Sequence, residues 1–268
     1  MPTAHIDDAT IFYRIDDFTD PWAAPETVHL HHAAAGNTER LRTWIPTLAR
    51  HYRVVRMDAR GHGRSSMPAR DYRWSIERLA RDVRDLISEA GLGPVHYAGA
   101  SAGGIIGLQF ARDYPELVRS LTLVAGTPRM AQTRVDYGEW LDRIARLGVR
   151  GFFQSDGATR FAPGTAAGLI DWFAETAAQT PESEVITFVP YMASVDLTDL
   201  LPEIKTPVLL LACEDDDITP REVQQILLDI LPNARLIVYP VRGHNIAEQL
   251  PDRCAADTLA FLQSLPRR

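Results

Sequence analysis

Three side chains that lie far apart in this sequence could together activate a serine hydroxyl: Ser101, Asp216 and His244. A serine hydroxyl is a weak nucleophile and needs a base nearby to take its proton. Histidine can be that base near neutral pH, and a carboxylate can then fix its tautomer and stabilise its charged form. Such a set attacks carbonyl carbon atoms and forms a covalent acyl-enzyme, provided that the fold brings the three groups together.

The serine carries the most specific signal, because segment 99–103 (GASAG) fits the pattern G-x-S-x-G. In that pattern the serine occupies a sharp turn between a strand and a helix. The residues two before and two after it crowd each other, and Gly99 and Gly103 are small enough for this turn. The helix that follows directs its first N–H groups at the site, which makes the backbone N–H of Ala102 a natural donor to an oxyanion.

The base and the acid follow later strands. His244 stands in a glycine-containing loop behind a predicted strand over Arg235–Tyr239, where an imidazole can reach the carboxyl edge of a sheet. Asp216 lies in the acidic stretch CEDDDITP, at the end of a predicted strand over Pro207–Ala212. The order serine, acid, histidine along the chain is one of the known orders of this triad.

The elements around these residues alternate between strands and helices, which predicts a mostly parallel sheet covered by helices on both faces. A hairpin is expected over Ala4–Ile15, and further strands over Val28–His31, Tyr52–Met57, Val95–Ala98, Leu121–Ala125, Pro207–Ala212 and Arg235–Tyr239. Helices are expected over Thr43–His51, Ile76–Ala90, Ala102–Asp113 and Arg221–Leu231, with a last one from Ile246 or Asp252 to Leu265.

Residues 127–202 interrupt this alternation, since they are helix-prone, rich in aromatic residues and broken by glycine and proline. We therefore expect one α/β core made of residues 1–126 and 203–268. The inserted segment is expected to form a helical lid (cap) over the carboxyl ends of the strands, where open α/β sheets bind their ligands.

Composition and charge restrict the class of protein. The chain has 268 residues, of which 46% are hydrophobic and 24% charged, as in soluble globular proteins. A net charge of -7 without any basic tract argues against nucleic acid as a partner. No apolar run approaches the roughly 18 residues of a membrane helix, and the N-terminal sequence lacks the apolar core of a signal peptide. We expect a cytoplasmic protein that acts on a small molecule and binds no membrane, with its oligomeric state left open.

With these motifs the chain resembles the α/β-hydrolase superfamily over nearly its whole length. Residues 58–65 (DARGHGRS) resemble the family's loop D-x-R-G-x-G-x-S, which is usually architectural, so Arg60 and His62 are interpreted as structural. The family's catalytic acid lies four residues before a proline. Counting back from Pro220, this spacing selects Asp216 over its acidic neighbours.

The loop at residues 30–33 (LHHA) resembles the family's L-H-G-x oxyanion loop. This likeness implies that the backbone N–H of Ala33 is the second oxyanion donor beside that of Ala102. His32 stands where the family usually has glycine, so we expect its side chain near the substrate.

Helix 75–90 and the end of the lid at residues 196–204 look most like 3-oxoadipate enol-lactonases and their relatives. That resemblance implies a small ester or lactone as substrate, with no cofactor and no metal ion. A metal site at His29, His31 and His32 is conceivable, but no acid or cysteine accompanies them at ligand spacing.

The substrate pocket is expected to be mainly apolar. Its candidate residues are His32 and five aromatic residues of the inserted segment, namely Trp140, Phe153, Phe161, Trp172 and Tyr191. The competing interpretation is that these aromatic residues form the core of the lid, because apolar stripes of helices usually pack against something. Arg129, Arg134 and Arg160 could bind a substrate carboxylate, although the interpretation as solvated surface arginines is favoured for each.

Three other functions fit the same residues. Carbon–carbon hydrolases of the meta-cleavage type use the same fold and triad. A lyase or a cofactor-free oxygenase on this scaffold can keep a Ser–His pair, and a non-catalytic ligand sensor can keep the whole triad. Fold alone does not decide among them, so a test with esters and lactones is needed.

Overall fold

A single eight-stranded sheet forms the centre of the computed structural model, which describes residues 2–130 and 133–266. Its strand order is β1-β2-β4-β3-β5-β6-β7-β8. The β1–β2 and β2–β4 pairs are antiparallel, whereas every pair from β4 to β8 is parallel. The strands are β1 (Thr3–Ile6), β2 (Ala9–Asp16), β3 (Thr27–His31), β4 (Arg53–Met57), β5 (Val95–Ala100), β6 (Val118–Val124), β7 (Val208–Asp215) and β8 (Ala234–Arg242). The mostly parallel sheet confirms the predicted fold class.

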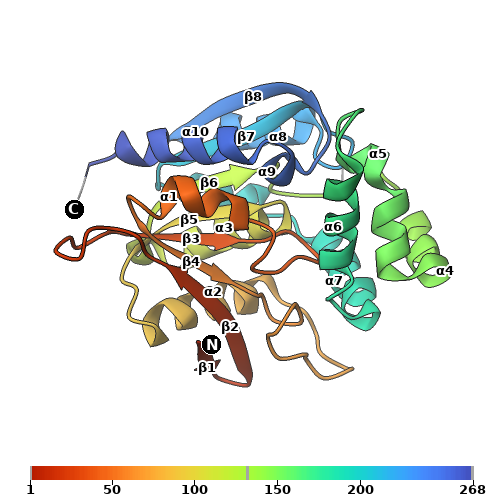
Figure 1. The fold of residues 1–268 in the computed structure, drawn as a ribbon, viewed down its shortest axis with the longest axis horizontal. Coiled ribbons are helices and arrows are strands. Elements are labelled where there is room, and N and C mark those ends of the chain that lie inside the picture. Colours follow the sequence, from red (N-terminus) through yellow and green to blue (C-terminus); the bar gives the residue numbers. More distant parts are fainter. Residues whose placement is uncertain (1, 131–132, 267–268) are drawn as a thin grey trace.

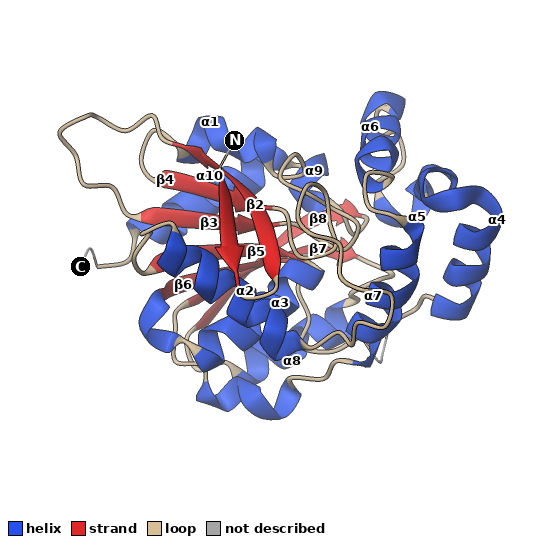
Figure 2. Ribbon diagram, turned by 90° about the horizontal axis from the view of Figure 1, so that it is seen from below, coloured by secondary structure: helices blue, strands red, loops and turns tan. Residues whose placement is uncertain are grey.

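Helices cover both faces of this sheet (Figures 1 and 2). One face carries α2 (Ile76–Glu89), α3 (Ala102–Asp113) and α8 (Arg221–Ile230), and the other carries α1 (Ile45–Leu48), α9 (Ile246–Gln249) and α10 (Pro251–Gln263). Two predicted helices differ from the observed ones. The one expected over Thr43–His51 is a 3₁₀ turn followed by the short α1, and the last one is divided because Pro251 begins a new helix.

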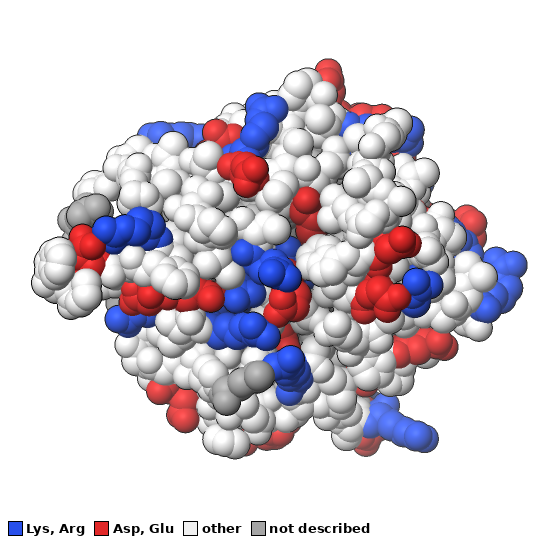
Figure 3. All heavy atoms as spheres, viewed as in Figure 1, with Lys and Arg blue, Asp and Glu red and all other residues white. Residues whose placement is uncertain are grey.

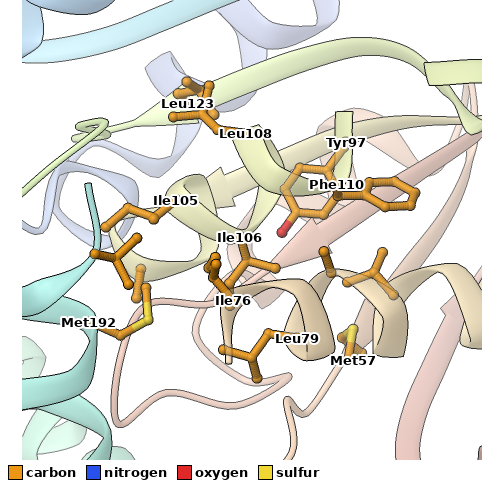
Figure 4. Packing of buried hydrophobic residues seen from close by; sticks show 14 of the residues in the cluster. Met57, Ile76, Leu79, Tyr97, Ile105, Ile106, Leu108, Phe110, Leu123 and Met192 are labelled. Carbon is orange, nitrogen blue, oxygen red and sulfur yellow. The ribbon is translucent and has the colours of Figure 1, made fainter. Parts of the chain in front are cut away.

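In the described part of the chain, four α-helices stand between β6 and β7 and gather beyond the carboxyl ends of the strands (Figure 1). We call them the cap helices: α4 (Tyr137–Ser155), α5 (Gly157–Arg160), α6 (Ala167–Ala177) and α7 (Glu182–Ser194). Met192 of α7 lies at the edge of the same apolar cluster as Ile76 and Ile105 (Figure 4). Apolar side chains therefore pack the cap helices onto the core.

The surface carries charges of both signs. Basic and acidic side chains are interspersed over the face in Figure 3. No helix in the described part of the chain is long and apolar enough to cross a membrane.

Strand β3 buries a cluster of histidine rings beneath the candidate site. The His29 ring stacks on Tyr97 with 5.2 Å between ring centres, and neither of its nitrogen atoms has a hydrogen-bond partner among the residues that the structure describes. The Tyr97 hydroxyl accepts from Nδ1 of His31 and donates to the carbonyl of Gly103, at 2.7 Å each. Burial lowers the pKa of His29 to about 3 and that of His32 to about 4. Among the described residues, no group of three or more His, Cys, Asp or Glu side chains is arranged so that it could hold a metal ion.

These buried histidines make the fold acid-sensitive. They stay neutral in the folded state, whereas the unfolded chain takes up protons near pH 6.5, so the free energy of unfolding falls as the pH drops below that value. We predict that His29→Phe weakens this dependence between pH 6.5 and 4 by about one proton. Urea unfolding at several pH values measures it, with the exposed His51→Gln as control. Equal slopes in wild type and His29→Phe would contradict the prediction.

Candidate active site

Ser101 occupies a strained turn between β5 and α3. Its φ of 48° lies in the left-handed region, which costs a non-glycine residue about 1–3 kcal/mol. A Cβ atom on Gly99 would lie 2.4 Å from the carbonyl oxygen of Gly103. A Cβ atom on Gly103 would lie 2.6 Å from that of His32. The two glycines predicted from the motif therefore permit both the turn and the close approach of the 30–33 loop.

The structure brings Asp216 and His244 together. Nδ1 of His244 donates to Oδ2 of Asp216 at 2.9 Å, and the Asp216 carboxylate is buried. This carboxylate also accepts from the N–H groups of Ile218 and Thr219 at 2.8 and 2.9 Å, and from the Thr219 hydroxyl at 2.6 Å. Burial by itself raises the pKa of Asp216, but His244 and these hydrogen bonds outweigh it and lower the pKa below its usual value. Asp216 is thus held as a carboxylate against the imidazole.

The neighbours of Asp216 have other partners. Asp215 and Asp217 both pair with Arg134 and with Arg242 at the surface. Thr219, which sequence reasoning missed, is the residue that completes the shell around Asp216. A threonine three residues after an aspartate and directly before a proline is a local signal that could have identified it.

Ser101 and His244 line one cavity of about 60 Å³. Ala33 and Ala102, the predicted oxyanion donors, line it beside Ser101. Most of the remaining wall is apolar and comes from the cap helices, and it includes Trp140 and Phe153. Besides Ser101 and His244, the polar residues in the wall are Tyr137, Arg160 and Asn245.

His32 does not line this cavity, which corrects the expectation of a side chain near the substrate. Its ring is buried, its Nδ1–H donates to the carbonyl of Ala33 at 2.7 Å, and its Nε2 accepts from the N–H of Ala59 at 2.9 Å. The imidazole therefore links the 30–33 loop to the backbone of Ala59, a contact that a glycine at position 32 could not make.

Three aromatic residues expected in the pocket are also absent from its wall. Phe161 packs edge-on against Phe173, with 5.1 Å between ring centres, inside the cap. Trp172 and Tyr191 are partly buried and pack against the main apolar cluster. These three side chains therefore pack against other apolar residues, as the competing interpretation has it.

A backbone contact joins the cap to the loop of His244. The carbonyl of Arg160, at the end of α5, accepts from the N–H groups of His244 and Asn245 at 3.0 Å each. Gly243 makes this approach possible, because a Cβ atom on it would lie 2.7 Å from the Arg160 carbonyl oxygen. Arg160 is buried, with only 6% of the residue exposed, which corrects the interpretation of a solvated arginine.

A family model described as alpha/beta hydrolase fold matches residues 26–249. The chain belongs to the alpha/beta hydrolase fold family. The resemblance stated from the motifs is therefore confirmed, and the chain is assigned to a family of hydrolases.

Relatives and solved structures extend this result. A putative carbamate hydrolase RutD from Azorhizobium caulinodans is 28% identical over 94% of this chain and 94% of its own length. Its counterpart from Pseudomonas savastanoi pv. phaseolicola is 30% identical over 78% of this chain and 85% of its own length. A similar fold is found in an enol-lactonase from Burkholderia xenovorans, with a TM-score of 0.88 and 19% identity over 98% of this chain and 100% of that one. A hydrolase from Pseudomonas aeruginosa has a TM-score of 0.83 and 26% identity over 97% of this chain and 96% of its own.

The contact between the cap and the loop of His244 predicts that a side chain at position 243 disturbs both stability and activity. We predict that Gly243→Ala lowers the free energy of unfolding by about 2 kcal/mol and reduces catalytic efficiency, because the added methyl group collides with the Arg160 backbone at a φ of 116°. Chemical denaturation and steady-state kinetics measure the two effects. Gly168→Ala is the control, since a Cβ atom there meets no atom within 4 Å. Wild-type behaviour of Gly243→Ala would contradict the prediction.

Proposed function

We propose that this chain is a serine hydrolase that cleaves a small carboxylic ester or lactone through an acyl-enzyme on Ser101. The observation that carries the proposal is that the Asp216–His244 pair, joined at 2.9 Å, opens onto the same cavity as the strained Ser101. Family membership supports a hydrolase, and the printed name of one structural neighbour, enol-lactonase, is consistent with this substrate class.

In the proposed mechanism His244 takes the proton of Ser101 through Nε2 while the serine oxygen attacks the carbonyl carbon. Asp216 accepts from Nδ1–H and stabilises the imidazolium that forms. The backbone N–H groups of Ala102 and Ala33 stabilise the oxyanion, each by about 3 kcal/mol of barrier. His244 then protonates the leaving oxygen. Finally it activates a water molecule that releases the acid and restores Ser101.

The cavity limits the size of the acyl group. Its volume of about 60 Å³ is smaller than the roughly 150 Å³ of an engineered cavity that holds benzene. Short aliphatic acyl groups therefore fit the closed site, and larger ones require the cap to move. We propose that residues 127–202 act as the lid that permits this movement.

A second candidate is hydrolysis of a small carbamate. The RutD relatives, named as putative carbamate hydrolases, cover most of this chain, and a carbamate carbonyl can be attacked by the same groups. The panel that tests the ester proposal therefore includes a small carbamate.

We predict that Ser101→Ala lowers kcat/KM by about 10³-fold or more on every ester or lactone that the wild type hydrolyses, because the nucleophile is lost. Initial rates on acetate, butyrate and benzoate esters, on small lactones and on methyl carbamate measure this effect. Ser88→Ala, at an exposed position of α2, is the control.

Turnover by Ser101→Ala close to that of the wild type would contradict the proposal. Absence of ester and lactone turnover in the folded wild type would do so as well. Turnover of methyl carbamate alone would favour the second candidate.

A further inference from the structure

We propose that Arg160 and Tyr137 bind a carboxylate of the substrate, so that this enzyme selects small esters or lactones which carry one acidic group. The inference rests on the proposed function and specifies its substrate class. It starts from the polarity of the cavity. The wall is apolar apart from Ser101, His244, Asn245 and these two side chains.

The Arg160 guanidinium is buried in the wall of the cavity. The Trp140 and Phe153 rings lie 4.8 and 4.6 Å from its central carbon. Contacts with ring faces use none of the N–H donors of a guanidinium, which can therefore still bind a planar anion through its edge. Aromatic packing thus fixes the orientation of the group and leaves donors for a ligand.

The Arg160 guanidinium shares its acidic partner with a second arginine. Asp156 is its only ion-pair partner among the described residues, at 3.0 Å from Nε. The same carboxylate also pairs with Arg143, at 3.1 Å. One carboxylate thus serves two guanidinium groups. The other nearby acid, Asp216, is already engaged by His244 and by its neighbouring hydrogen bonds.

The Tyr137 hydroxyl adds a neutral donor to this charge. Its oxygen atom is buried, and among the described residues it has no hydrogen bond of normal geometry, although the Thr133 side chain lies near it. The ring is fixed edge-on against Trp140, with 5.4 Å between ring centres. Buried polar groups are almost always satisfied, so this hydroxyl on the cavity wall is suited to donate to an atom of a ligand.

A carboxylate suits this pair better than other groups. It can take N–H donors from the guanidinium and one O–H donor from the tyrosine. An apolar chain would leave the hydroxyl orphaned, and a cation would be repelled by Arg160. Because Ser101 and Arg160 line the same cavity, we expect only a few carbon atoms between the scissile ester and the acidic group.

Two esters of similar shape test the inference, monomethyl succinate with its carboxylate and methyl levulinate with a neutral methyl ketone in its place. We expect the wild type to favour monomethyl succinate in kcat/KM, and Arg160→Gln to reduce that preference by about tenfold or more. Tyr137→Phe should reduce it several-fold without opening a cavity. The backbone contact from Arg160 to His244 is retained in Arg160→Gln, because it uses only the carbonyl group.

Arg143→Gln is the matched control, since Arg143 shares Asp156 but does not line the cavity. It should keep the preference of the wild type. A preference that is absent in the wild type, or that survives both Arg160→Gln and Tyr137→Phe, overturns the inference.

Binding separates this inference from the proposed function. Calorimetry measures the affinity of succinate for Ser101→Ala with and without Arg160→Gln. Arg160-dependent binding together with no ester turnover by the wild type supports the carboxylate site and contradicts the hydrolase proposal. If the wild type hydrolyses esters without preferring monomethyl succinate, and succinate does not bind, the hydrolase proposal stands and the carboxylate site is overturned.

Discussion

The strained backbone of Ser101 is the constraint on which the rest of the site depends. A positive φ at a serine persists only where its surroundings hold it, and here its N–H donates to the carbonyl of Val124 on the neighbouring strand at 2.9 Å. The turn also requires close contact between segments. Gly103 lies against the backbone of the 30–33 loop, and its carbonyl accepts from the Tyr97 hydroxyl. The same packing that exposes the serine therefore positions the loop that is proposed to bind the oxyanion.

The histidine side of the site depends on the cap in a comparable way. His244 is oriented by Asp216 through its ring and by the Arg160 carbonyl through its backbone. The helix that follows is tied to the core by the buried Arg40–Glu248 ion pair at 3.1 Å. The cap therefore contributes two backbone hydrogen bonds to the loop of His244. If the cap acts as the proposed lid, an opening that moves Arg160 away would break these two bonds and so affect the position of His244.

The sequence predicts the core of this protein well, because its signals are local. The pattern at residues 99–103 encodes the turn, and helix 102–113 is found at its predicted bounds. The spacing to Pro220 selects the acid that contacts His244, since Asp216 is at hydrogen-bond distance and its neighbours are not. The order of the strands along the chain is sufficient to place these groups at one edge of the sheet.

The pocket could not be predicted in the same way, because long-range packing decides it. His32 turns away from the cavity because the Ala59 N–H group and the Ala33 carbonyl satisfy both of its ring nitrogens. The burial of Arg160 depends on Asp156 together with rings that arrive from another helix. The Arg40–Glu248 pair joins residues separated by 208 positions, and no local pattern signals such a contact.

Covalent labelling with a small fluorophosphonate tests the central claim most directly, because such reagents react with a serine only when it is activated as a nucleophile. Mass spectrometry of the intact protein and of its peptides then locates the adduct. The account predicts one adduct per chain, on Ser101, whose formation slows at least about 100-fold in His244→Gln. An unlabelled Ser101 in folded protein, or labelling that is insensitive to His244→Gln, would contradict it.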